Sequence, residues 1–294
     1  MSQKRQQGIW FALSVIERTV RLLPHRWALA FGAGLGSLVR LCSRKRVDKA
    51  EARCVRALGV GVSTAREIVT QSYRNLGRSL VEFYRLPLTA SHIGDYVTIH
   101  GEDHLRQALE RGKGVILMTA HFGSWEVAAA MLARGGFPMN AIGAEQRDER
   151  ITAKIESLRA QAGVKPIGKG FDLKAALACL RRGEILGVLL DQDARDKGMV
   201  VPFLGLPAST PYGPVKLAHK LGAAVVPIFT VRRPDGFTHD LHLLPPLEGK
   251  SGPFGADLEA DLAQCNGIIS RWIADYPDHW LWLYPRWMST LGDA

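Results

Sequence analysis

One short stretch, residues 119–126, places a histidine, a glycine, a serine and a glutamate directly after an apolar run. His121 stands where a strand predicted over residues 115–118 would leave its sheet, and Ser124 is a residue type that begins helices. Glu126, five residues after His121, would lie in the first turn of the next helix. From there its carboxylate can hold the imidazole in one tautomer and stabilise the protonated form. A histidine held in this way is a general base for a hydroxyl nucleophile.

The turn between this strand and helix supports the same chemistry. Gly123 permits a tight turn, and the free backbone N–H groups at the helix start, beside Ser124, can stabilise a developing oxyanion. The alternative is that His121 is a structural histidine and that Glu126 is only a favourable acidic residue near a helix N-terminus.

A second group of polar residues, Asp191-Gln192-Asp193, follows an apolar run at 185–190. Two carboxylates in a D-x-D pattern can bind a divalent cation held by a diphosphate, as in many sugar-nucleotide transferases. The same pattern is common in turns and helix caps. His239 and His242 would point to opposite faces of a strand, so we interpret them as structural.

The elements that must position these residues alternate between short apolar strands and amphipathic helices from about residue 95 onward. The apolar runs at 115–118, 185–190 and 223–231 are typical of strands buried on both faces. This alternation predicts a single α/β sandwich around a mostly parallel sheet, covering residues 61–294. Ahead of it, residues 64–67 form a capping box that opens a helix, which we expect to stop before Pro87.

The N-terminal part of the chain carries most of its net positive charge. Residues 1–56 hold twelve basic and three acidic side chains, a net of +9 of the total +10. Trp10, Phe11 and Trp27 are interspersed among the arginines, and the apolar run at 27–39 is too short to span a bilayer. Residues 1–60 are therefore predicted to be a helical segment that docks on an anionic membrane surface. The alternative is a pair of core-packing helices; a polar stripe suited to nucleic acid is not present.

Residues 119–126 read T-A-H-F-G-S-W-E and resemble the H-x(4)-D/E block of the glycerolipid acyltransferases, above all that of the lipid A lauroyl/myristoyl acyltransferases. Five further blocks agree with that family in order and spacing: Leu158-Arg159 followed by Gly163, Asp191-Gln192-Asp193, residues 201–210 (V-P-F-L-G-L-P-A-S-T), Ala224-Val225-Val226-Pro227, and residues 280–287 (W-L-W-L-Y-P-R-W) with Arg286.

The resemblance implies an acyltransferase on the cytoplasmic face of the inner membrane. Its donor would be an acyl thioester of acyl carrier protein or of CoA, and its acceptor a hydroxyl of a phosphorylated glycolipid such as a lipid A precursor. His121 would be the base, Glu126 its partner and Arg159 a ligand for acceptor phosphate. The D-x-D would then hold no metal, and no cofactor is expected. The remaining residues implied in substrate binding are Gly123, Ser124, Asp191, Asp193 and Arg286.

Two departures concern the acceptor. Residues 147–150 read R-D-E-R where lipid A enzymes commonly carry Asn-Pro, and Pro285 and Met288 flank the final Arg-Trp pair where basic residues are usual. A relative that acylates a lysophospholipid or another glycolipid therefore stays open. So do a metal-dependent glycosyltransferase using Asp191 and Asp193, and a non-catalytic membrane-docked protein.

Overall fold

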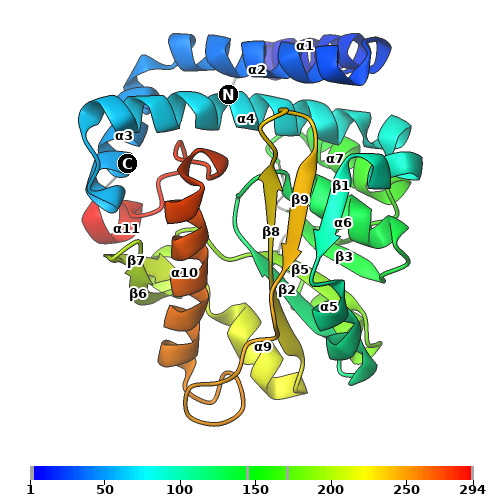
Figure 1. Cartoon of the computed structure of the whole chain (residues 1–294), viewed down its shortest axis with the longest axis vertical. Helices are drawn as coiled ribbons and strands as arrows, with labels where there is room; N and C mark the ends of the chain where they lie inside the picture. Colours follow the sequence, from blue (N-terminus) through cyan, green and yellow to red (C-terminus); the bar gives the residue numbers. More distant parts are fainter. Residues whose placement is uncertain (1–2, 144–145, 170–171, 293–294) are drawn as a thin grey trace.

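A computed structural model describes residues 3–143, 146–169 and 172–292, with side chains from residue 6 onward and without those of 168–169. Its centre is a seven-stranded sheet in the order β1-β9-β8-β2-β5-β3-β4 (Figure 1). The strands are β1 (Val97–His100), β2 (Val115–Thr119), β3 (Met139–Gly143), β4 (Lys165–Lys169), β5 (Ile185–Leu189), β8 (Ala224–Arg232) and β9 (His239–Leu243). Among the described strands of this sheet, the β8–β9 pairing alone is antiparallel, so the predicted single α/β domain with a mostly parallel sheet is confirmed.

Both faces of the sheet are buried. On β2, Val115 and Leu117 belong to one hydrophobic core, and Ile116 and Met118 belong to the other. This double burial explains why the strand is apolar at every position rather than at alternate ones. The covering helices are α5 (Glu102–Glu110), α6 (Trp125–Arg134) and α7 (Glu149–Gln161) on the side of Leu117, and α8 (Leu173–Arg181), α9 (Gly213–Leu221) and α10 (Leu258–Asp275) on the side of Ile116.

Beyond the sheet, β6 (Met199–Phe203) and β7 (Leu206–Thr210) form a separate antiparallel hairpin that sequence patterns did not predict. The chain closes with the short helix α11 (Met288–Leu291), which lies against this hairpin and next to α3 in the view of Figure 1.

The N-terminal helices form a layer at one end of the domain. They are α1 (Gln3–Leu22), α2 (His25–Cys42), α3 (Arg44–Leu58) and α4 (Val62–Thr89), and α1 and α2 lie on the outer side of α4 (Figure 1). Helices α2 and α4 cross in very close contact: a Cβ built on Gly36 would lie 2.1 Å from the backbone oxygen of Tyr73, and one on Gly77 would lie 2.1 Å from that of Gly32. Only glycine permits this approach.

Helix α4 corrects two expectations. It begins at Val62 after Gly61 and has no side-chain cap, so Thr64 does not cap it. It also continues through Pro87 to Thr89. The last turn survives the loss of one backbone donor because its neighbours Leu86 and Ala90 are buried in the core, and tertiary packing outweighs local propensity there.

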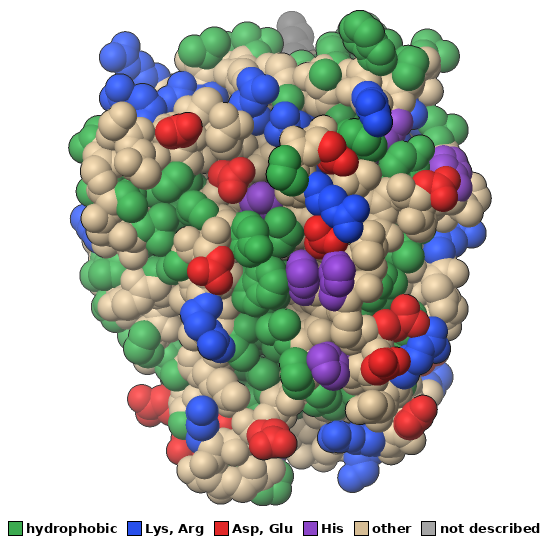
Figure 2. Space-filling model, viewed as in Figure 1, with side chains coloured by type: hydrophobic (Ala, Val, Ile, Leu, Met, Phe, Trp, Pro, Cys, Tyr) green, Lys and Arg blue, Asp and Glu red, His purple; other side chains and the backbone are tan. Residues whose placement is uncertain are grey.

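The outward side of α1 and α2 is apolar and basic. Phe11 and Trp27 are each about 70% exposed, and Leu22 and Leu41 are exposed as well. Figure 2 shows hydrophobic and Lys or Arg side chains gathered at this end of the molecule. Among the helices that the structure describes, none is long and apolar enough to cross a bilayer.

Candidate active site

His121 is held by a buried carboxylate, that of Asp191. The His121 Nδ1–H donates to Asp191 Oδ1 over 2.9 Å, and the His121 backbone N–H donates to Oδ2 over 2.9 Å. The indole N–H of Trp280 donates to the same Oδ2 over 2.8 Å. With Nδ1 protonated toward this carboxylate, Nε2 is the basic nitrogen of the neutral ring.

The register of the sheet explains the pairing. Strands β2 and β5 are parallel neighbours with Thr119 opposite Leu189. His121 and Asp191 each follow that pair by two residues, so both side chains leave the sheet at the same edge.

The surroundings shift both groups toward an ion pair. Burial alone would lower the pKa of His121, but the charge and hydrogen bond of Asp191, with a further contribution from Glu126, raise it above its ordinary value. Burial works to raise the pKa of Asp191, yet His121 and the indole of Trp280 hold it below its ordinary range. The imidazole also packs on the ring of Tyr284, with centroids 6.1 Å apart.

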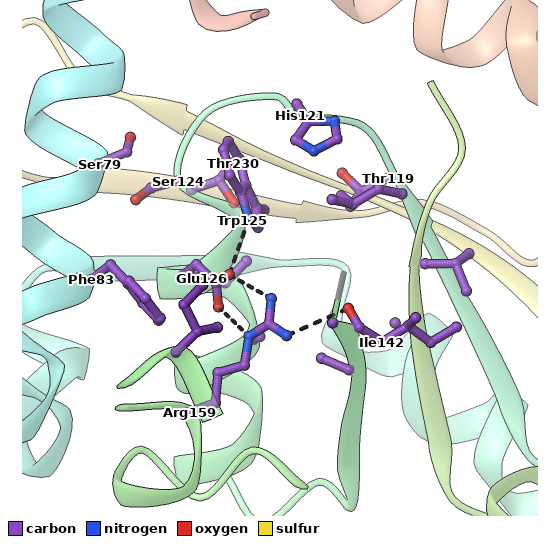
Figure 3. A pocket seen from close by; sticks show the side chains of 18 of the residues that line it. Ser79, Phe83, Thr119, His121, Ser124, Trp125, Glu126, Ile142, Arg159 and Thr230 are labelled. Atoms are coloured by element: carbon purple, nitrogen blue, oxygen red, sulfur yellow. Dashed lines mark hydrogen bonds and ion pairs between the residues drawn. The ribbon is translucent and has the colours of Figure 1, made fainter. Parts of the chain in front are cut away.

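Glu126 does not hold His121 through a hydrogen bond, contrary to the sequence interpretation. Its carboxylate accepts from Arg159 Nε over 3.0 Å and from Arg159 Nη2 over 2.7 Å, and from the indole N–H of Trp125 over 3.2 Å (Figure 3). In the first turn of α6 the side chain turns toward α7, which carries Arg159. The second carboxylate of the site therefore forms a bidentate ion pair with a nearly buried guanidinium.

The loop after β2 is fixed in place on several sides. Gly123 has a φ of +58°, and a Cβ there would lie 1.8 Å from the backbone oxygen of Thr230, so only glycine fits. Its N–H donates to the backbone oxygen of His279 over 2.8 Å. Ser124 stands at the N-cap of α6, but its hydroxyl makes no capping bond and donates instead to Glu82 over 2.6 Å.

A cavity of about 710 Å³ opens beside His121. Ser124, Glu126 and Arg159 contribute its polar side, and the rest is mainly apolar. Its apolar lining comes from α1, α4, β2, α6, β3 and α7, and includes Trp10, Leu13, Leu80, Phe83, Leu132 and Ile155. Such a volume and lining suit a ligand with a long apolar part and a few polar groups at one end.

The other predicted substrate ligands lie outside the lining of this cavity. Asp193 accepts from the backbone N–H and hydroxyl of Ser289, over 2.8 and 2.6 Å. Arg286 is fully buried and donates to the backbone oxygen of Ser209 over 2.6 Å and to Thr210 Oγ1 over 2.6 Å. These two residues fasten the C-terminal segment to the β6–β7 hairpin and the loop after β5. Gly123 and Asp191 also lie outside the lining of the cavity. Gly123 fixes the conformation of the loop, and Asp191 orients the imidazole of His121.

In the described part of the chain, no cluster of three or more His, Cys, Asp and Glu side chains could hold a metal ion. Both oxygens of Asp191 are occupied by protein donors. His239, interpreted as structural from the sequence, is buried and hydrogen-bonded to Glu82 over 2.8 Å.

Comparison with known proteins identifies the family of the chain. The chain is 28% identical to a phosphatidylinositol mannoside acyltransferase of Mycolicibacterium smegmatis, covering 94% of this chain and 90% of the relative. It is 26% identical to the lipid A biosynthesis lauroyltransferase of Escherichia coli K12, covering 95% and 91%. Residues 2–289 match the model of the bacterial lipid A biosynthesis acyltransferase family. The chain belongs to the bacterial lipid A biosynthesis acyltransferase family, and it is an acyltransferase.

Proposed function

We propose that the protein moves a fatty acyl chain from a thioester, of acyl carrier protein or of CoA, to a hydroxyl of a lipid A precursor or a related glycolipid. The observation that carries the proposal is the His121–Asp191 pair beside a mainly apolar cavity that His121 lines. The family supports acyl transfer to a glycolipid, and it disfavours the glycosyltransferase and non-catalytic alternatives.

The chemistry follows from the basic Nε2 of His121. Nε2 takes the proton of the acceptor hydroxyl while its oxygen attacks the thioester carbonyl carbon. The tetrahedral intermediate collapses as the carbon–sulfur bond breaks, and the imidazolium returns the proton to the leaving thiolate. Asp191 stabilises the imidazolium throughout without taking its proton. The N–H groups at the start of α6, which Ser124 leaves uncapped, supply donors for the oxyanion.

Glu126 supports this base from a distance. Its negative charge contributes to the raised pKa of His121, although the carboxylate is hydrogen-bonded to Arg159. Arg159 in turn lines the cavity, with Nε and Nη2 bonded to Glu126 and Nη1 donating to the backbone oxygen of Ile142 over 3.4 Å. A phosphate or another anion of the acceptor would bind at the second N–H groups of Nη1 and Nη2, on the edge of the guanidinium that Glu126 does not occupy. We assign Glu126 two tasks, electrostatic support of His121 and orientation of Arg159.

The apolar part of the cavity is the proposed site of the acyl chain. Phe83, Leu132 and Ile155 offer a hydrocarbon wall that neither a sugar nor a nucleotide would match. Trp10 and Leu13 of α1 complete the wall, so the helix that bears the exposed Phe11 also borders the cavity. This arrangement supports docking on a membrane, where lipid substrates are reached from the bilayer. We propose the cytoplasmic face of the inner membrane, as the resemblance to lipid A enzymes implies.

The experiment is turnover with defined substrates. Purified protein is incubated with acyl carrier protein thioester or acyl-CoA and with a lipid A precursor, a phosphatidylinositol mannoside or a lysophospholipid, and the products are identified by mass spectrometry. The expected product is an acylated glycolipid formed equally well in EDTA. Acylation of the lysophospholipid alone would overturn the glycolipid assignment, and loss of activity in EDTA would overturn the metal-free mechanism.

A further inference from the structure

A buried ionic cluster lies directly behind the loop that carries His121. It comprises Glu82 of α4 with Arg232 and His239 of β8 and β9, and the exposed fractions of the three residues are 4%, 7% and 1%. Arg232 Nη1 donates to Glu82 Oε1 over 2.5 Å and Nη2 donates to Oε2 over 2.8 Å. The acyl-transfer chemistry described above uses none of these three side chains.

The cluster has a defined charge state. Burial works to raise the pKa of Glu82, but Arg232 and His239 hold it well below its ordinary value. Burial lowers the pKa of His239, whose Nε2–H donates to Glu82 while its buried Nδ1 has no partner. Glu82 and Arg232 therefore form a fixed ion pair beside a neutral imidazole.

Hydrogen bonds lead from this cluster toward the active-site loop by way of two serines, Ser124 and Ser79. Ser124 donates its hydroxyl proton to Glu82 Oε2 over 2.6 Å, in a position where a serine hydroxyl ordinarily accepts from the first turn of its helix. Ser79, one turn from Glu82 on α4, accepts from Arg232 Nη2 over 3.4 Å and donates to the backbone oxygen of Gly123 over 3.2 Å. Figure 3 shows Ser79 and Ser124 on the same side of the view, with His121 to their right.

We infer that Glu82 is a positioning residue, which acts through Ser124 to fix the loop at residues 121–124 and to keep the first-turn N–H groups of α6 free for the substrate. The inference rests on the proposed acyl transfer. The ion pair with Arg232 fixes the position of the Glu82 carboxylate. Because this carboxylate accepts the hydroxyl proton of Ser124, it also fixes the rotamer of Ser124. The loop then presents His121 and the start of α6 in one geometry, as a preorganised site requires.

Two variants test this link without leaving Arg232 buried opposite a neutral side chain. Ser124→Ala removes only the hydroxyl, and Glu82→Asp keeps the charge but shortens its reach. Thr89→Val is the matched control, because the Thr89 hydroxyl is also buried on α4 but donates to the backbone oxygen of Arg85, away from the loop. Each variant is first compared with wild type by thermal unfolding.

We expect Ser124→Ala and Glu82→Asp each to lower kcat about tenfold, with the donor KM within about twofold, because the loss is one of orientation. Their combination should cost little more than the larger single loss, since both act through one hydrogen bond. Amide hydrogen exchange of residues 120–125 should become about tenfold faster in both variants and stay unchanged in Thr89→Val.

Wild-type kcat in Ser124→Ala, or fully multiplicative losses in the double variant, would overturn the inference. A fall in kcat with unchanged exchange would also overturn it, because Ser124 would then act on the reacting atoms rather than on the loop. Failure of the proposed function would be seen separately, because the wild type would then transfer no acyl chain. The positioning link would still be tested in that case, since unchanged amide hydrogen exchange of residues 120–125 in Ser124→Ala would refute it.

Discussion

At the scale of single residues, the protonation of His121 sets the pH range of the reaction. The neighbouring carboxylates raise the pKa of His121, so the ring is protonated, and useless as a base, up to a higher pH than an ordinary histidine. We expect kcat/KM to fall as the pH is lowered through a value above 6.5. A profile of kcat/KM against pH for the wild type measures this limb.

Asp191→Asn should shift the acid limb of the profile of kcat/KM against pH to lower pH. The substitution removes the charge that raises the pKa of His121 and leaves the burial that lowers it. It also destabilises the tautomer of His121 in which Nδ1 carries the proton and Nε2 is the base. We expect kcat to drop by about 100-fold or more and the acid limb to shift to lower pH. Asp193→Asn, which touches the C-terminal segment and not the cavity, is the control and should stay within about twofold of wild type. Equal effects of the two variants would refute the assignment.

The ion pair of Glu126 and Arg159 gives a second residue-scale prediction. Arg159→Lys keeps a positive charge but loses the two parallel bonds to Glu126 and the planar fork that fits a phosphate. The acceptor KM should rise about tenfold and the donor KM should hold. Initial rates measured with the acceptor and the donor varied in turn give the two KM values. An unchanged acceptor KM would mean that Arg159 serves only to pair with Glu126.

Local sequence was informative about His121 and less so about its partner. The uniformly apolar strand 115–118 located the sheet edge at which His121 stands, and Asp191 was recognised at the end of another such strand. Their pairing depends on β5 lying next to β2, and strand order is a property of the whole sheet. Sequence proximity favours Glu126 as the partner of His121, but the direction of the Glu126 side chain at the start of α6 takes it to Arg159.

At the scale of elements, the crossing of α2 and α4 depends on glycine. Gly36→Ala would place a methyl group 2.1 Å from the backbone oxygen of Tyr73, so the helices must separate. We expect the free energy of unfolding to fall by about 1–3 kcal/mol in urea titrations. Gly34→Ala on the same helix meets no atom within 4 Å and should be neutral or stabilising by about 0.5–1 kcal/mol. Equal losses in both variants would show that the close approach of α2 to α4 is not what requires glycine at position 36.

The same scale shows where sequence patterns fell short. The strands of the parallel sheet were predictable because each is an apolar run between turn signals. Residues 201–210 carry a motif, but their pattern does not predict a hairpin, because the exposed Val200 and an internal proline obscure the alternation of β6. Pro87 was expected to end α4, but the buried turn around Leu86 continues past it.

At the scale of the whole molecule, residues 1–60 are predicted to dock the enzyme on a membrane. Each basic residue near an anionic surface contributes about 1 kcal/mol to the binding free energy, so the basic residues together give firm binding. Salt weakens this electrostatic attraction, because charges more than about 10 Å apart are screened at about 0.1 M ionic strength. Insertion of Phe11 and Trp27 is not screened, so high salt should release the protein only in part and detergent completely. Membrane fractionation measures this, and complete release by salt alone would contradict insertion.

Variants separate the apolar contribution. The double variant Phe11→Ser and Trp27→Ser should bind anionic vesicles more weakly and become fully salt-extractable, because both side chains are about 70% exposed on the outer helices. Val200→Ser, at an exposed apolar residue on the separate β6–β7 hairpin, is the control and should bind as the wild type does. Vesicle co-sedimentation at low and high salt compares them, and equal weakening in both would assign the effect to general surface polarity.

The most direct test of the account is the acyl-transfer rate of His121→Ala beside wild type. With thermal unfolding unchanged, the loss of the general base should lower kcat by about 100-fold or more, whichever acceptor proves to be the substrate. Near-normal kcat in a folded His121→Ala protein would contradict the assignment of this site as the centre of the reaction.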